Sequence, residues 1–214
     1  MSRREEVLAE MGLSPVWVLR NKASPEKTET PAGWIPLKQA VPACTACKLH
    51  SSRTQTVFGV GDENADWLLI GEAPGADEDR LGEPFVGQAG KLLDNMLAAI
   101  GLSRGDNVYI ANVLKCRPPG NRNPEPDEVA KCTPFLLQQI SLIQPKLIVA
   151  MGRFAAQTLL NTDASIASLR GRQHTYAGVP LIVTYHPAYL LRNLPDKAKA
   201  WADLVFARKT MASL

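Results

Sequence analysis

Short apolar runs alternate along the chain with segments in which apolar residues recur every three or four positions. Nearly unbroken apolar runs of four or five residues are typical of strands buried on both faces, and they occur at Trp67–Ile70, Val108–Ala111, Leu147–Met151 and Leu181–Tyr185. The helical spacing predicts helices over Lys91–Ile100, Pro126–Ile143 and Arg153–Leu160, and a last helix that Pro195 opens. The pattern therefore predicts an α/β fold.

Buried strands that are separated by helices indicate a parallel sheet with helices on both faces. Ligands bind such sheets just beyond the carboxyl ends of the strands. This rule nominates four places, which are Gly71–Gly75, Asn112 onwards, Gly152 onwards and His186 onwards. We therefore expect a functional site at this edge of the sheet.

The first 40 residues differ from the rest of the chain. Residues 1–22 could form a short helix in which Val7, Leu8 and Met11 share a face, and residues 23–42 contain four prolines and look like a linker. We therefore divide the chain into an arm of unknown role at 1–40 and a domain at 41–214. The sequence shows no apolar run that could span a membrane and no apolar signal segment, so the expected location is the cytoplasm.

The composition is that of an ordinary globular protein, with 214 residues of which 45% are hydrophobic and 21% charged. The net charge is only +3, but residues 62–83 contain eight acids and one base, so the rest of the chain is distinctly basic. A basic body beside an acidic segment is compatible with a polyanionic partner. An ordinary solvated surface explains the same charges, so charge alone does not assign a function.

Four cysteines form one candidate site. Cys44 and Cys47 are a C-x2-C pair, Cys116 follows the second predicted strand, and Cys132 lies in the next predicted helix. In a cytoplasmic chain this pattern favours a metal site over disulfides. Tetrahedral zinc and a 4Fe–4S cluster both accept four thiolates, so the spacing leaves both open. Two buried free cysteines beside an accidental pair would need no metal.

The strand ends carry side chains that suit a planar ligand. Phe85 lies between two glycine-containing turns and could stack on such a ligand, while Asn112 could donate to and accept from the edge of a base. His186 precedes a proline that restrains the backbone. A buried core aromatic and a turn-capping amide are the simpler interpretations of Phe85 and Asn112.

Two loops extend this candidate site. Gly71 and Gly75 let the backbone turn and approach a ligand closely, although no phosphate-binding or dinucleotide-binding motif is present. After His186 come two apolar residues and a cation, Leu190, Leu191 and Arg192. An apolar wedge beside a base is one way to open a nucleic-acid stack. A helical turn packed against the core would explain the leucines as well.

The motifs become specific when they are read together and in order. They are GEAPGADED from Gly71, EPFVG from Glu83, VYIAN and LKCRPP after Val108, the four-cysteine spacing, and HPAYLLR from His186. Over about residues 41–210 the chain resembles the family 4 uracil-DNA glycosylases, the iron–sulfur members of their superfamily. The resemblance implies a three-layer α/β/α fold with a central four-stranded parallel sheet. It also implies hydrolysis of the N-glycosidic bond of deoxyuridine in DNA, and it favours a 4Fe–4S cluster over zinc.

The resemblance also implies roles for individual residues. Phe85 would stack on the flipped uracil, Asn112 would bind its Watson–Crick edge, and His186 would hydrogen-bond O2 as charge develops on the leaving base. The residues expected at the DNA minor groove are Leu190, Leu191 and Arg192.

The acidic loop matches the family less completely. Glu72 matches an acid beside the base-binding loop and is expected to act in catalysis, and Glu78 matches a second acid that could crowd C5 so that thymine is refused. Ala73 and Gly75 belong to the same substrate-binding loop. Ala73 stands where better-known uracil glycosylases have an aspartate that orients the attacking water, so the group that handles water is not assigned. Residues 117–131 contain no histidine of the kind that cross-links a relative to abasic DNA, so we expect turnover.

Two other classes of protein compete with this interpretation. A non-enzymatic DNA-binding module, with a structural zinc site made of the four cysteines, would be colourless and would release no uracil. An electron-transfer protein would leave Phe85, Asn112 and His186 without a purpose. We expect a monomer that binds a 4Fe–4S cluster and acts on uracil-containing DNA, double- or single-stranded, with no membrane partner.

Overall fold

The computed structural model describes residues 10–11 and 33–214, and the fold below is that of the unit Pro31–Leu214. The helix expected within residues 1–22 and most of the expected arm lie outside the described residues. Within the described part, no helix is both long and apolar enough to cross a membrane.

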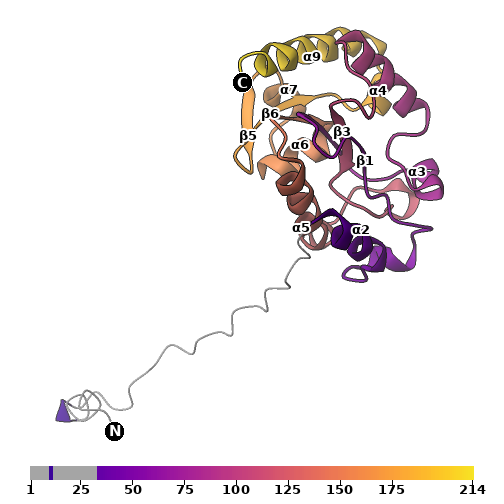
Figure 1. Ribbon diagram of the computed structural model, residues 1–214, viewed down its shortest axis with the longest axis vertical. Coiled ribbons are helices and arrows are strands. Elements are labelled where there is room, and N and C mark those ends of the chain that lie inside the picture. Colours follow the sequence, from indigo (N-terminus) through magenta and orange to yellow (C-terminus); the bar gives the residue numbers. More distant parts are fainter. Residues whose placement is uncertain (1–9, 12–32) are drawn as a thin grey trace. The chain divides into compact units, whose positions relative to one another are not determined.

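A six-stranded sheet forms the centre of this unit (Figure 1). Its order is β1-β3-β2-β4-β6-β5. The four inner strands are parallel, as expected, and comprise β3 (Val108–Asn112), β2 (Trp67–Gly71), β4 (Leu147–Met151) and β6 (Val179–Thr184). Each overlaps a predicted apolar run, although β6 begins at Val179 rather than at the predicted Leu181, and the inner strands β2, β3 and β4 are buried along their whole length.

Two short antiparallel edge strands were not expected from the sequence. They are β1 (Val60–Gly61), which pairs with β3, and β5 (Gln173–Tyr176), which pairs with β6. A two-residue turn joins β5 to β6, with positive φ at both Ala177 (49°) and Gly178 (82°), the geometry that suits a tight hairpin. β5 alternates exposed and half-buried residues, as suits an edge strand, and it lacks the apolar run that marks the inner strands.

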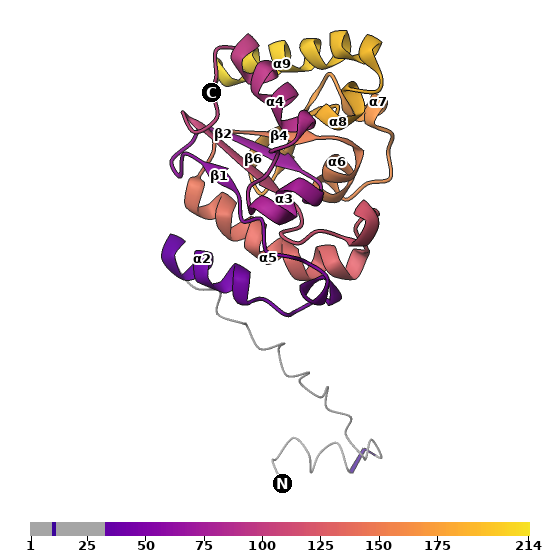
Figure 2. The ribbon, with the colours of Figure 1, turned by 90° about the vertical axis from the view of Figure 1, so that its right-hand side faces the viewer.

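Helices cover both faces of the sheet, which confirms the three-layer prediction (Figure 2). Alternate residues of each strand point to opposite faces. Leu68 and Ile70 of β2 pack with α5 (Pro126–Ile143), α6 (Arg153–Leu160) and α7 (Ile166–Leu169). Trp67 and Leu69 pack with α4 (Gln88–Ala99) and α9 (Lys197–Met211). The helices α4, α5, α6 and α9 follow the predicted spacing, and a short 3-10 turn at Leu194–Asp196 precedes α9.

Three further helices lie where the sequence suggested a linker or loops. α2 (Trp34–Ala43) occupies the proline-containing segment and packs on α5, so the linker interpretation is wrong for these residues. α3 (Ala76–Leu81) follows Gly75 and ends at Gly82, whose φ of 80° suits a glycine. α8 (Pro187–Leu190) follows β6, and 3-10 turns cover Lys48–Ser51 and Pro119–Asn121. Two of these helices, α3 and α8, border the site described next.

Candidate active-site cleft and cysteine pocket

A cleft of about 750 Å³ opens at the carboxyl ends of the four parallel strands. The register sets Gly71 of β2 directly beside Asn112 of β3, while Gly152 follows β4 and His186 follows β6. The cleft therefore lies where the strand-end rule places it. The expected site residues that line it are Glu72, Ala73, Gly75, Glu78, Phe85, Asn112, His186 and Arg192.

The floor of the cleft is a close contact between Gly71, Phe85 and Asn112. A Cβ on Gly71 would collide with Asn112 Oδ1 and would lie 2.7 Å from Phe85 Cζ. The absence of a side chain at Gly71 thus lets the amide and the ring meet. The Phe85 ring also stacks on His186, with 5.4 Å between ring centroids and 29° between planes. The Asn112 amide, the Phe85 ring and the His186 imidazole therefore lie close together in the cleft.

His186 is held as a neutral donor. It is the N-cap of α8, and its Nδ1 accepts the backbone N–H of Ala188 at 3.1 Å. Because Nδ1 accepts, the proton of the neutral ring lies on Nε2. Burial lowers the pKa of His186 to about 4. At neutral pH the side chain can therefore donate from Nε2 without carrying a charge.

The two cleft acids differ in what surrounds them. Burial raises the pKa of Glu72 to about 7, and the charge of Arg153 acts against that rise. Glu78 instead accepts two backbone N–H groups, Gly75 N at 3.1 Å and Val86 N at 3.1 Å. Its carboxylate thus ties the Gly75 loop to the loop that carries Phe85. The thymine-refusing role expected for Glu78 stays a prediction.

Asn112 is anchored from behind by a buried lysine. Asn112 is 3% exposed, and its backbone carbonyl accepts Lys115 Nζ at 2.9 Å. Lys115 Nζ also donates to Gln139 Oε1 at 2.6 Å, and Gln139 Nε2 donates to the carbonyl of Phe58 at 2.9 Å. Burial lowers the pKa of Lys115 to about 8. This chain of hydrogen bonds fixes the end of β3.

Of the three residues expected at the DNA minor groove, only two are exposed. α8 turns Leu190 inward, where it is 1% exposed and packs with Tyr185 and Ala200, so Leu190 is a core residue and is not available as a wedge. Leu191 is 41% exposed, and Arg192 is exposed on the rim of the cleft. The alternative of a buried helical turn is therefore correct for Leu190 alone.

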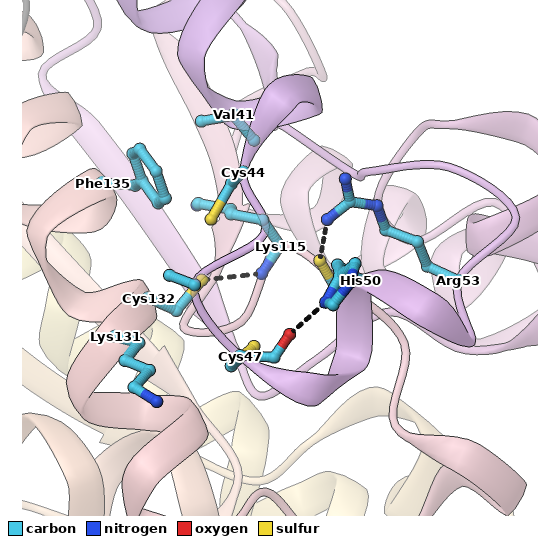
Figure 3. Close-up of a pocket in the computed structure, with 11 residues that line it drawn as sticks. Val41, Cys44, Cys47, His50, Arg53, Lys115, Lys131, Cys132 and Phe135 are labelled. Atoms are coloured by element: carbon cyan, nitrogen blue, oxygen red, sulfur yellow. Dashed lines mark hydrogen bonds between the residues drawn. The ribbon is translucent and has the colours of Figure 1, made fainter.

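The four cysteines line one small pocket, which we call the cysteine pocket (Figure 3). They come from the end of α2, the start of the 3-10 turn at Lys48, the loop after β3, and α5. Arg53 Nη1 donates to Cys116 Sγ at 3.1 Å, and the N–H of Lys115 donates to Cys132 Sγ at 3.2 Å. The structure thus brings all four predicted ligands together.

The cysteine pocket is buried at Cys116 and Cys132, half-buried at Cys44 and Cys47, and lined by basic side chains. Burial raises the pKa of the Cys132 thiol to about 11 and also raises the pKa of the Cys116 thiol. Arg53, Lys115 and Lys131 line the same pocket. Within the described residues, no group of three or more His, Cys, Asp or Glu side chains is arranged to hold a single metal ion.

Comparison with known proteins shows which family this chain is similar to. The family model described as the uracil DNA glycosylase superfamily matches residues 58–205. The chain belongs to this superfamily. It is 50% identical to a type-4 uracil-DNA glycosylase of Archaeoglobus fulgidus over 70% of this chain and 78% of that protein. A type-4 enzyme of Thermotoga maritima is 46% identical over 76% and 85%, and one of Pyrobaculum aerophilum is 43% identical over 78% and 89%. The resemblance seen in the sequence motifs is confirmed.

The cleft also contains residues that the sequence motifs did not single out. Arg153 opens α6 directly after Gly152, and Tyr185 and Tyr189 flank His186 along the chain. Arg153 follows the third of the nominated strand ends, so the strand-end rule was the signal that could have found it. The tyrosines carry no comparable signal, because aromatic residues beside a strand are usually part of the core.

Proposed function

We propose that this chain is a uracil-DNA glycosylase of the iron–sulfur type, which flips uracil out of DNA and hydrolyses its N-glycosidic bond to leave an abasic site. The observation that carries the proposal is the convergence of Phe85, Asn112 and His186 on one cleft. Stacking, edge recognition and leaving-group stabilisation are the three functions that excision of a base requires. The matches to type-4 enzymes over most of the chain support the same function.

Binding of the flipped base comes first. Flipping costs a few kcal/mol, and stacking on Phe85 offsets about 1–3 kcal/mol of that cost. The Asn112 amide can donate to O4 of uracil and accept from N3–H. Because Asn112 is buried and held through its own carbonyl by Lys115, its side chain meets the base with little freedom to move.

Bond cleavage follows. The C1′–N1 bond breaks with its electron pair going to uracil, and negative charge grows on O2. Nε2–H of the neutral His186 donates to that oxygen, which lowers the barrier by about 3–4 kcal/mol. Water adds to C1′ and gives its proton to the carboxylate of Glu72, which later releases it to solvent. Because Glu78 is occupied by two backbone N–H groups, we assign stabilisation of the cationic sugar and of this water to the carboxylate of Glu72.

We also propose that Cys44, Cys47, Cys116 and Cys132 hold a 4Fe–4S cluster. Four thiols converge in one pocket, N–H groups point at two sulfurs, and the basic side chains of Arg53 and Lys115 can offset the negative charge of thiolate ligands. When bound, the cluster supplies four iron–sulfur bonds that cross-link segments distant in the sequence. Its contribution is thus to hold the loop after β3 in place.

The remaining features fit a DNA surface. Arg153 and Arg192 line the cleft, and the exposed Leu191 precedes Arg192, so the rim can contact phosphate and fill the space that the flipped base leaves. We propose that the enzyme acts as a monomer in the cytoplasm on double- or single-stranded DNA.

The test is incubation of the purified protein with a labelled oligonucleotide that contains one uracil, followed by alkali to cleave abasic sites. We expect a cleaved product from the uracil strand and none from a matched thymine strand. Binding without uracil release would contradict the proposal and would favour the non-enzymatic DNA-binding module.

A further inference from the structure

The backbone of Phe85 is in an unusual conformation. Its φ is +55°, in the left-handed region, where a residue that carries a Cβ is disfavoured. Such outliers persist only when the surrounding structure holds them, and they gather at functional sites. The side chain of Phe85 is the ring that stacks on His186 in the floor of the cleft. Whatever holds this backbone therefore also sets the position of the ring.

Arg104 holds the Phe85 backbone from outside the cleft. It lies on the loop between α4 and β3 and is not among the residues that line the cleft. Its Nη1 donates to the carbonyl of Pro84 at 2.9 Å, and its Nη2 donates to the carbonyl of Phe85 at 2.9 Å. Its Nε donates to Asp94 Oδ1 at 3.0 Å, which orients the guanidinium from α4.

The same peptide segment is held on its other side. The next N–H, that of Val86, donates to Glu78 Oε1 at 3.1 Å. The Phe85 carbonyl also lies directly against Gly90 of α4, where a Cβ would collide with it. The carbonyl of Phe85 and the following N–H are thus both fixed by charged side chains.

We infer that Arg104 is a positioning residue for base stacking, which acts by clamping the Phe85 backbone together with Glu78. This inference rests on the proposed function, because it needs Phe85 to stack on the flipped base. Arginine suits the role because its planar fork can reach two carbonyls and a carboxylate at once. The ammonium of a lysine is a single point and cannot span the same three acceptors.

A double-mutant cycle tests the inference with Arg104→Gln and Phe85→Ala. Single-turnover excision of uracil is measured for the wild type, each variant and the pair. We expect Phe85→Ala to lower the rate about tenfold or more, which matches the loss of stacking, and Arg104→Gln to lower it about fivefold to tenfold. In the double variant the Arg104 change should cost less than about twofold further, because the ring it positions is gone.

Two measurements separate positioning from loss of fold. Affinity for DNA that carries a stable abasic-site analogue should change less than about twofold in Arg104→Gln, since no base needs to stack there. Ile143→Val, a change in the core on the face of the sheet opposite to Phe85, is the control and should leave excision unchanged in the wild type and in Arg104→Gln. If Arg104→Gln fails to fold, Arg104→Lys replaces it, with a smaller loss expected.

The outcomes are distinct. If the Arg104 change costs the same factor with and without the Phe85 ring, Arg104 acts elsewhere and the inference is overturned while the proposed function stands. If the wild type releases no uracil, or if Phe85→Ala excises at the wild-type rate, the proposed function of the ring fails and the inference falls with it.

Discussion

The cleft and the cysteine pocket meet on one loop, but the chain builds them differently. The cleft collects residues that follow parallel strands, so the register of the sheet alone sets Gly71 beside Asn112. The cysteine pocket instead draws on α2, a 3-10 turn, a loop and α5, none of which is a strand. A site on strand ends is positioned by the strands of the core. A site built from helices, turns and loops relies instead on contacts, or on a bound cluster, that join those segments. We therefore expect the two regions to fail in different ways.

The largest effect should follow from breaking the cysteine pocket. Cys116→Ala removes one of the four proposed cluster ligands, so we expect iron content to fall from about four atoms per chain to nearly none. Soluble yield should fall with it. Iron analysis and yield of anaerobically purified protein are the measurements.

His50→Gln is the control for this change, because His50 lines the same pocket, contributes no thiol and hydrogen-bonds the carbonyl of Cys47 through its ring. It should keep its iron. A Cys116→Ala protein with normal yield and full excision would contradict the proposed role of the pocket.

A substitution in the cleft should slow excision strongly and leave the fold intact. His186→Ala removes the proposed donor to O2, and we expect single-turnover excision to fall about 100-fold or more. Iron content and DNA affinity should stay close to those of the wild type. Excision within about threefold of the wild type would rule out His186 as the donor.

The raised pKa of Glu72 determines the pH dependence that we expect for excision. Because its pKa is raised to about 7, the carboxylate form grows as the pH rises, and excision should increase through pH 7 and level off above it. Neutral His186, with a pKa of about 4, should add no step there. Glu72→Gln should be slower, by about tenfold at pH 8, with a flat profile between pH 6 and pH 8. A step near pH 7 that survives the substitution would assign it to another group.

The same raised pKa has a consequence for stability. The protonated acid favours the folded state, so the stability that Glu72 contributes is fully present below about pH 4.5 and is lost as the pH rises through about 7. Glu72→Gln removes this loss. The difference in Tm between variant and wild type should therefore be more positive at pH 8 than at pH 5.

The smallest effect should come from the residue that links the two regions. Lys115 donates from its backbone to Cys132 Sγ and from its side chain to the carbonyl of Asn112. Lys115→Met keeps the backbone donor and loses the side-chain donor, so iron should be retained while excision falls about fivefold. Loss of iron with normal excision would show that the charge of Lys115 is required by the cysteine pocket and that its bond to Asn112 is not required for excision.

The sequence predicts the layers well because parallel strands that are buried on both faces appear as nearly continuous apolar runs. It misses α2, since Pro36 and Pro42 look like breakers, yet Pro36 lies in the first turn, where the missing N–H has no helical partner. It misses α3 because an acidic helix of six residues shows no apolar spacing. The edge strand β5 is missed for a similar reason, because it is polar and half exposed.

The candidate site divides in the same way. The strand-end residues and the cysteines are visible in the sequence because their types are unusual for those positions. The left-handed backbone of Phe85 is not, since it depends on Arg104, 19 positions away. Nor is the inward turn of Leu190, which is set by packing against Tyr185 and Ala200. Side-chain direction in a short helix is decided by tertiary contacts that no local pattern records.

Asn112→Asp tests the central claim that this cleft recognises uracil. The measurement is single-turnover excision of uracil and of mispaired cytosine in one sequence context, with Asn161→Asp, outside the cleft, as the matched control. A carboxylate has no donor for O4, so we predict uracil excision at least about 100-fold slower, with any new activity directed at cytosine, whose amino group an acceptor can bind. Undiminished excision of uracil by Asn112→Asp would contradict it.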